Sequence, residues 1–185
     1  MKADVSNADD VRRMFETTEQ QLGKVDVLVN NAGVLKTLPL ADTSDALYDQ
    51  TFDINVRGTF NTLREAAARM NNGGRIVNFS STTLALNMPG YAIYNGTKAA
   101  VEAFTHVFAK ELRGRNITVN AVAPARSRPR CSSTARPKNR SRLRQMPPLQ
   151  RLGQPDDIAS VVSFLAGPDA GWVNGQILRA NGGVA

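Results

Sequence analysis

The sequence predicts an α/β fold in which helices cover both faces of a doubly wound parallel sheet. Short apolar, β-branched runs alternate along the chain with longer segments that carry apolar residues at helical spacing, and this alternation is typical of sheets built from βα units. The strand-like runs lack polar alternation, as expected for strands buried on both faces. The 185 residues are enough for one core, so we expect 1–185 to form a single domain.

In the first half of the chain, the clearest local signal marks a helix that ends near Leu22. Ser6 or Asn7 can cap its start, Asp9 and Asp10 suit the positive end of its dipole, and Gly23 ends it. Further along, we expect a buried strand at 25–29, helices at 43–50 and 54–70, and a strand at 76–79.

The second half of the chain continues the alternation. Pro155, followed by two aspartates, is typical of a helix start. The elements expected in this half are a helix at 92–112, a strand at 117–122, a helix at 155–165 and a last strand at 176–178.

The net charge of +7 suggests a nucleic-acid partner, but its distribution argues against one. Residues 125–155 carry nine Lys or Arg and no acidic residue, whereas the remainder carries 14 basic and 16 acidic residues. The basic segment has almost no large apolar residue, so we expect 125–147 to be an irregular or disordered loop. Its abrupt composition is typical of translation in a shifted reading frame.

The composition argues against a membrane-spanning, secreted or disulfide-linked protein. No apolar run approaches the roughly 20 residues of a membrane span, and no secretory signal opens the chain. The single Cys131 cannot form an internal disulfide. We therefore expect a cytoplasmic protein with neither a membrane nor a nucleic-acid partner, and we expect no metal site.

The stretch from Ser81 to Lys98 carries the candidate chemistry. If a helix starts near 91, Tyr94 and Lys98 lie one turn apart on one helix face. An ammonium beside a phenol lowers the phenol's pKa, which makes Tyr94 a candidate proton donor and acceptor. Ser81 follows the strand at 76–79 and could orient a substrate carbonyl.

Each of these residues has a competing interpretation. Tyr94 and Lys98 could be an ordinary exposed pair on a helix. Tyr91 could replace Tyr94, although the residue four positions after Tyr91 is an asparagine. Ser80 could replace Ser81.

Taken together, four segments resemble the short-chain dehydrogenase/reductase family. Ser81, twelve residues and then Tyr94-x-x-x-Lys98 resemble its catalytic segment, and the spacing favours Ser81 over Ser80. Asn55 matches the asparagine of its catalytic tetrad. The run at 25–33, ending in Asn-Asn-Ala-Gly, resembles one of its strand ends, and the run at 172–183 resembles its last strand. The resemblance covers 4–124 and resumes near 149.

The resemblance implies a Rossmann-like fold, NAD or NADP as cofactor, and hydride transfer to or from a small carbonyl or secondary alcohol, as in a 3-oxoacyl reductase. It also implies self-association as a homo-oligomer, a dimer or a tetramer. The implied catalytic residues are Asn55, Ser81, Tyr94 and Lys98. The implied cofactor-binding residues are Asp4, Val5, Asn30, Asn31, Ala32, Gly33, Tyr94, Lys98 and Pro124.

The sequence departs from the family pattern in two places. In the family, the position of Asp4 follows the third strand, and here the first glycine is Gly23. We therefore expect this partial domain to lack the first βαβ units and the glycine-rich turn, which leaves the strand at 25–29 with an open edge. The second departure is the segment at 125–145. A catalytically inactive remnant that acts only through subunit association is the alternative.

Overall fold

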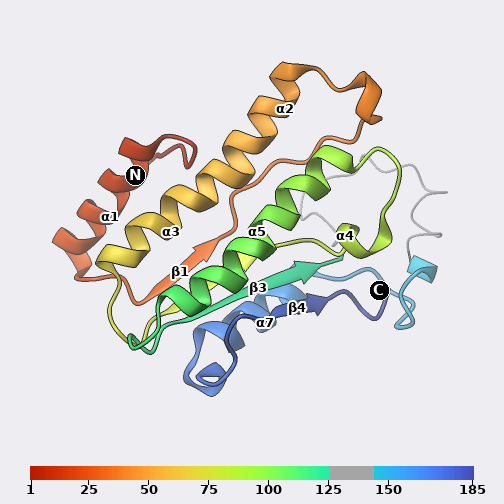
Figure 1. Ribbon diagram of the computed structural model, residues 1–185. Coiled ribbons are helices and arrows are strands. Elements are labelled where there is room, and N and C mark those ends of the chain that lie inside the picture. The colour runs from red at the N-terminus through yellow and green to blue at the C-terminus, as the bar shows by residue number, and fades with distance from the viewer. Residues whose placement is uncertain (126–143) are drawn as a thin grey trace.

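The computed structural model describes residues 1–125 and 144–185 and shows the expected α/β architecture (Figure 1). Its sheet has four parallel strands in the order β1-β2-β3-β4. The strands are β1 (Val27–Asn30), β2 (Arg75–Phe79), β3 (Thr118–Pro124) and β4 (Ile177–Ala180). Of the loop expected at 125–147, residues 126–143 lie outside the described residues.

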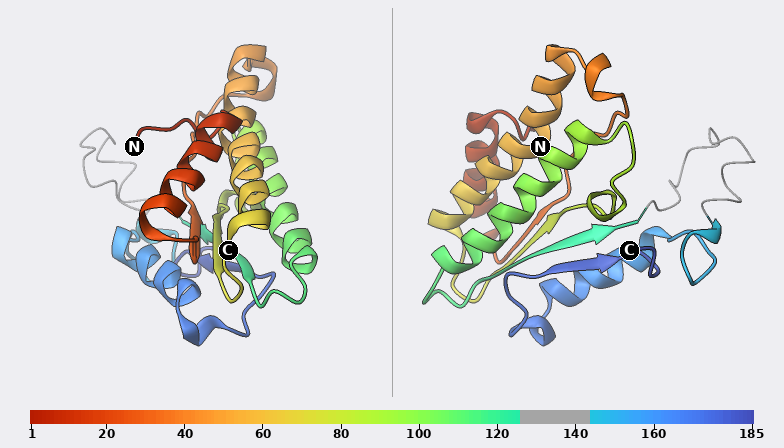
Figure 2. Two further views of the ribbon diagram at one scale, coloured as in Figure 1. Left: turned by 90° about the vertical axis from the view of Figure 1, so that its left-hand side faces the viewer. Right: turned by 45° about the vertical axis from the view of Figure 1, so that its right-hand side comes forward.

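Helices cover both faces of this sheet, as predicted. Figure 2 shows α1, α3 and α5 on one face and α7 on the other. The main helices are α1 (Ala8–Leu22), α2 (Asp45–Phe52), α3 (Gly58–Arg69), α5 (Ala92–Glu111) and α7 (Pro155–Ala166). None of the helices in the described ranges has a stretch long and apolar enough to cross a bilayer.

Alternation along the strands divides the core into two clusters. Ile76 packs with Phe15 and Leu63 beneath α1 and α3, whereas its neighbour Val77 packs with Leu165 of α7. Successive strand residues point to opposite faces, so the central strand β2 supplies both layers. This explains why its apolar residues do not alternate with polar ones.

The first helix begins and ends as predicted. The side chain of Asn7 accepts hydrogen bonds from the backbone N–H groups of Asp9 and Asp10, at 2.9 and 3.1 Å. Gly23 ends the helix with φ of +89°, a conformation that strains residues with a Cβ.

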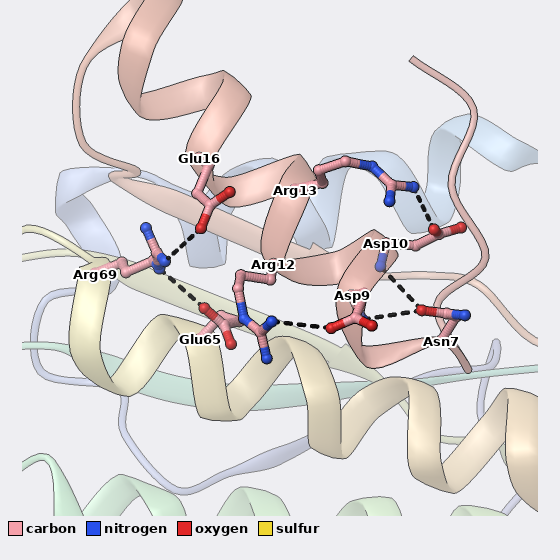
Figure 3. Close-up of polar contacts among 8 residues, drawn as sticks. All are labelled: Asn7, Asp9, Asp10, Arg12, Arg13, Glu16, Glu65 and Arg69. Carbon is pink, nitrogen blue, oxygen red and sulfur yellow. Dashed lines mark hydrogen bonds and ion pairs between the residues drawn. The ribbon is translucent and has the colours of Figure 1, made fainter.

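An ion-pair cluster holds this helix against α3. Arg69 of α3 contacts Glu19 and Glu16 of α1 at 2.8 and 3.2 Å, and Glu65 of its own helix at 2.9 Å. Figure 3 shows its guanidinium between the two helices. Glu19 is the largest cause of the raised pKa of Arg69. The cluster fixes α1 laterally while the apolar core holds it from below.

The two helices expected at 43–50 and 54–70 form one unbroken helical run, which is a correction. Ser44 caps its start, and a π-helical turn, η2 (Asp53–Arg57), joins α2 to α3. A π turn inserts one extra residue into the helix and often marks a functional site. Asn55 lies in this turn. The short helix α4 (Thr83–Leu86) was not predicted.

The strand expected at 25–29 begins two residues later and is not fully buried. Leu28 is 8% exposed, but Val27 and Val29 are 42% and 40% exposed. They face the side of the sheet on which α7 packs over β2, β3 and β4. Within the described ranges, β1 pairs only with β2, so the expected open edge is present.

This edge is expected to make the protein self-associate non-specifically, because an open strand with exposed valines pairs readily with other chains. We predict polydisperse particles in light scattering, and a lower associated fraction for the double variant Val27→Lys, Val29→Lys. Leu22→Lys, which removes an exposed leucine away from the strand, is the control and should change little. A monodisperse wild-type protein would contradict the prediction.

Candidate active site

The predicted site residues meet where the parallel strands end. Asn30 pairs in register with Asn78, and their side-chain amides are joined by a 2.8 Å hydrogen bond. Just past the end of β2, the backbone N–H of Thr82 donates to the carbonyl of Pro124 at 3.1 Å. The carboxyl ends of β1, β2 and β3 therefore form one edge, where ligands of such sheets bind.

Tyr94 and Lys98 lie on one face of α5, as predicted. The helix begins at Ala92, so the two residues are one turn apart, with Lys98 Nζ 5.6 Å from the centroid of the Tyr94 ring. Lys98 is 6% exposed, and its Nζ donates to the carbonyl of Phe79 at 2.8 Å. Lys98 is thus anchored at the end of β2. Because Lys98 is buried and Tyr94 is half-buried, the interpretation as an ordinary exposed pair is wrong.

The electrostatics of this pair differ from the expectation. Burial raises the pKa of Tyr94, an effect that the Ser81 hydroxyl partly offsets. Burial also lowers the pKa of Lys98 to about 8. Low polarity disfavours the charged form of both groups, and this effect of burial is the largest on Tyr94. The lowered pKa that was predicted for Tyr94 is therefore corrected, because its pKa is raised.

Asn55 is buried and holds the loop after β1. Its Oδ1 accepts from the Val34 N–H at 2.8 Å, and its Nδ2 donates to the Val34 carbonyl at 2.9 Å and to Thr97 Oγ1 at 3.1 Å. A Cβ on Gly33 would lie 3.2 Å from Asn55 Oδ1 and 3.7 Å from Lys98 Nζ. Asn55, Gly33 and Lys98 therefore meet, while Asn31 and Ala32 lie exposed beside them.

Ser81 and Tyr94 line one cleft of about 660 Å³, together with Pro124. Ser80 is not among the residues that line this cleft, and its hydroxyl donates to Glu102 at 2.5 Å, which supports Ser81 as the cleft serine. Tyr91 also lines the cleft. Most of the remaining wall is apolar and includes Leu35, Leu86, Met88, Met146 and Leu149.

Asp4 and Val5 lie beside α3, just before α1. Asn61 Nδ2 donates to the Val5 carbonyl at 3.0 Å, and a Cβ on Gly58 would lie 2.7 Å from Val5 Cγ2. Asp4 Oδ1 accepts from the Ser6 hydroxyl and N–H, and these bonds lower its pKa. Asp4 is thus an exposed carboxylate held by local hydrogen bonds.

Sequence reasoning missed the residues that hold these groups in place. Val34 and Thr97 bind Asn55, and Asn61 with Gly58 positions Val5. Their roles arise from contacts far apart in the chain, so no local pattern marks them. Across the described residues, no cluster of three or more His, Cys, Asp or Glu could hold a metal.

Comparison with known proteins adds the family. A family model described as enoyl-(acyl carrier protein) reductase matches residues 1–185. A short-chain type dehydrogenase/reductase of Picea abies is 41% identical, over 98% of this chain and 69% of its own length. The chain belongs to the short-chain dehydrogenase/reductase family.

Two further relatives agree with this family membership. A 3-oxoacyl-[acyl-carrier-protein] reductase of Staphylococcus aureus is 38% identical over 100% of this chain and 76% of its own length. A crystal structure of a short-chain dehydrogenase of Burkholderia cenocepacia in complex with NADP is 31% identical with a TM-score of 0.92, over 100% of this chain and 75% of that one. The fold is therefore the Rossmann-like fold of short-chain dehydrogenases/reductases. This chain spans about three quarters of the length of these relatives.

The buried lysine should make stability depend on pH. In the folded protein the pKa of Lys98, about 8, lies below the ordinary lysine value of 10.5, so between these values the unfolded chain binds more protons than the folded one. The free energy of unfolding then rises with pH, by at most about 1.4 kcal/mol per unit. Urea unfolding from pH 8 to 10 should show wild type gaining stability relative to Lys98→Met. For the control Lys110→Met, at an exposed position, the difference from wild type in the free energy of unfolding should stay constant over this pH range.

Gly33 should tolerate no side chain, because Asn55 Oδ1 is pinned by Val34 and cannot move away from a new Cβ. We expect Gly33→Ala to destabilise the protein by about 1–3 kcal/mol. In Gly96→Ala, the new Cβ would lie 3.7 Å from Phe52, and alanine favours the helix by up to about 1 kcal/mol. Denaturant unfolding of both variants compares them, and equal effects would refute the close approach at Gly33.

Proposed function

We propose that this protein is an NAD(P)-dependent oxidoreductase that transfers a hydride between the nicotinamide cofactor and a carbonyl or secondary alcohol. The observation that carries the proposal is the joint arrangement of Tyr94 and Lys98 on one face of α5, with Ser81 lining the same cleft as Tyr94. A proton donor, a cation and a hydroxyl that can hold a carbonyl oxygen are the groups that such a reaction needs.

The residues around Lys98 fit the nicotinamide–ribose half of the cofactor. One proton of the Lys98 ammonium is engaged by the Phe79 carbonyl, which leaves two donors for ribose hydroxyls. Gly33 has no side chain where one would touch Asn55 and Lys98, so a ligand can approach this loop closely. Asn30, Asn31 and Ala32 would hold the cofactor from the same loop, and Pro124 would lie near the nicotinamide.

The adenine half has a second candidate location. Asp4 and Val5 would contact the adenine ring, because Asn61 holds the Val5 backbone in place. The two locations would hold opposite ends of the dinucleotide.

Within the cleft, each side chain has a distinct task. The bound cofactor supplies the hydride. Ser81 would donate a hydrogen bond to the substrate oxygen, and Tyr94 would give that oxygen its proton. Because burial raises the pKa of Tyr94, its phenol stays protonated near neutral pH, which favours carbonyl reduction. Alcohol oxidation requires the phenolate and should accelerate as pH rises. Asn55 would hold the loop and a proton-relaying water.

The remaining assignments follow from family membership and composition. The substrate would be a small carbonyl compound or secondary alcohol, and the Staphylococcus aureus relative favours a 3-oxoacyl compound. The apolar cleft wall suits its acyl chain. We infer a single-domain cytoplasmic protein that forms a homo-oligomer, a dimer or a tetramer, without a nucleic-acid or membrane partner.

Substitution of Tyr94 tests the proposal. Tyr94→Phe should abolish reduction of ethyl acetoacetate while cofactor binding persists, because the ring is retained and only the proton donor is lost. Turnover is followed by the absorbance of NADH or NADPH at high cofactor concentration, and binding by their fluorescence. Tyr91→Phe, in the same cleft, should remain active. Wild-type rates in Tyr94→Phe would refute the assignment. A wild-type protein without turnover that still self-associates would support the inactive alternative.

A further inference from the structure

We propose that Thr83 and Asn95 are positioning residues that hold the Ser81 hydroxyl in its working place by tying the segment that carries Ser81 to the helix that carries Tyr94. The inference rests on the proposed function, in which Ser81 binds the substrate oxygen. Neither residue was singled out from the sequence.

Two groups of Thr83 form hydrogen bonds with the Ser81 hydroxyl. Its backbone N–H donates to Ser81 Oγ at 3.3 Å, and its Oγ1 lies 2.9 Å from the same oxygen. Ser81 is buried, with 8% of its surface exposed, yet its side chain lines the cleft. The position of the Ser81 oxygen is therefore set by its hydrogen bonds with Thr83 rather than by contact with solvent.

Asn95 in turn forms two hydrogen bonds with Thr83. Thr83 Oγ1 donates to Asn95 Oδ1 at 2.7 Å, and Asn95 Nδ2 donates to the Thr83 carbonyl at 3.0 Å. The second bond sets the orientation of the amide, because the reversed amide would bring two carbonyl oxygens together. Asn95 therefore presents an acceptor, and only an acceptor, to the Thr83 hydroxyl.

The number of available protons gives the direction of the hydrogen bonds from Ser81 through Thr83 to Asn95. A threonine hydroxyl carries one proton, and Asn95 Oδ1 can only accept it. The proton between Thr83 Oγ1 and Ser81 Oγ is therefore supplied by Ser81. While Tyr94 is protonated and no ligand is bound, the Ser81 proton points at Thr83, and it must turn to a substrate carbonyl on binding. The Thr83 N–H still holds Ser81 Oγ while the proton turns.

These hydrogen bonds of Thr83 and Asn95 connect the two segments that carry Ser81 and Tyr94. Asn95 follows Tyr94 directly on α5, and Thr83 lies two residues after Ser81 at the start of α4. The Thr83–Asn95 pair thus sets the separation of the two groups that share one substrate oxygen. Displacements of about 1 Å in such groups can cost about 100-fold in rate.

Three variants test this arrangement. Thr83→Val keeps the shape and the backbone N–H but removes the hydroxyl, and Thr83→Ser keeps the hydroxyl. Asn95→Ala removes both hydrogen bonds between Asn95 and Thr83. Crystal structures of the variants report the Ser81 rotamer. Steady-state reduction of ethyl acetoacetate at saturating NADPH or NADH reports kcat and KM, and thermal unfolding reports the fold.

We expect one Ser81 rotamer in wild type and Thr83→Ser, and more than one in Thr83→Val and Asn95→Ala. We expect kcat to fall about tenfold in the latter two, with Thr83→Ser within about twofold and with the KM for cofactor and the thermal midpoint unchanged. A single rotamer in Thr83→Val, or an equal loss in Thr83→Ser, would overturn the proposal. If wild type shows no turnover, the proposed function fails, and the rotamers alone decide this inference.

Discussion

The hydrogen bond from the Lys98 ammonium to the Phe79 carbonyl is the contact on which the site depends. It joins α5 to the carboxyl end of β2 and places a buried cation where the parallel strands end. A charge in this position carries a desolvation cost, visible in the lowered pKa of Lys98. Buried charged groups with shifted pKa values are often found at functional sites, and this supports the pair with Tyr94 as the candidate site.

Around this contact, asparagine side chains connect the loops to the helices. Asn55 binds the backbone of Val34 on both its N–H and its carbonyl, and Asn95 binds Thr83 in a similar two-point way. A carboxamide supplies both a donor and an acceptor without charge. It can therefore satisfy buried loop groups at a smaller desolvation cost than an ionised side chain would carry. These amides fix the loops without adding charge beside Lys98.

Much of the fold and of the site could be predicted from the sequence, because the relevant signals are local. Asn7 and Gly23 set the ends of α1, and the i, i+4 spacing of Tyr94 and Lys98 follows from helix geometry once the helix start is known. The division of 43–70 into two helices was wrong, since a π turn keeps the helix intact and leaves no break in the residue pattern. The pKa of Tyr94 was misjudged because burial is a tertiary quantity.

By itself, the sequence determined most of the order of strands and helices and the face of α5 that carries Tyr94 and Lys98. These depend on periodicity, capping and spacing within short stretches of chain. The family followed from the resemblance of four sequence segments to its motifs. Only the tertiary structure decided that Gly33 meets Asn55 and Lys98, that Val27 and Val29 lie exposed, and that Asn95 reaches Thr83. These contacts join residues from different elements, and their formation depends on how the helices pack on the sheet.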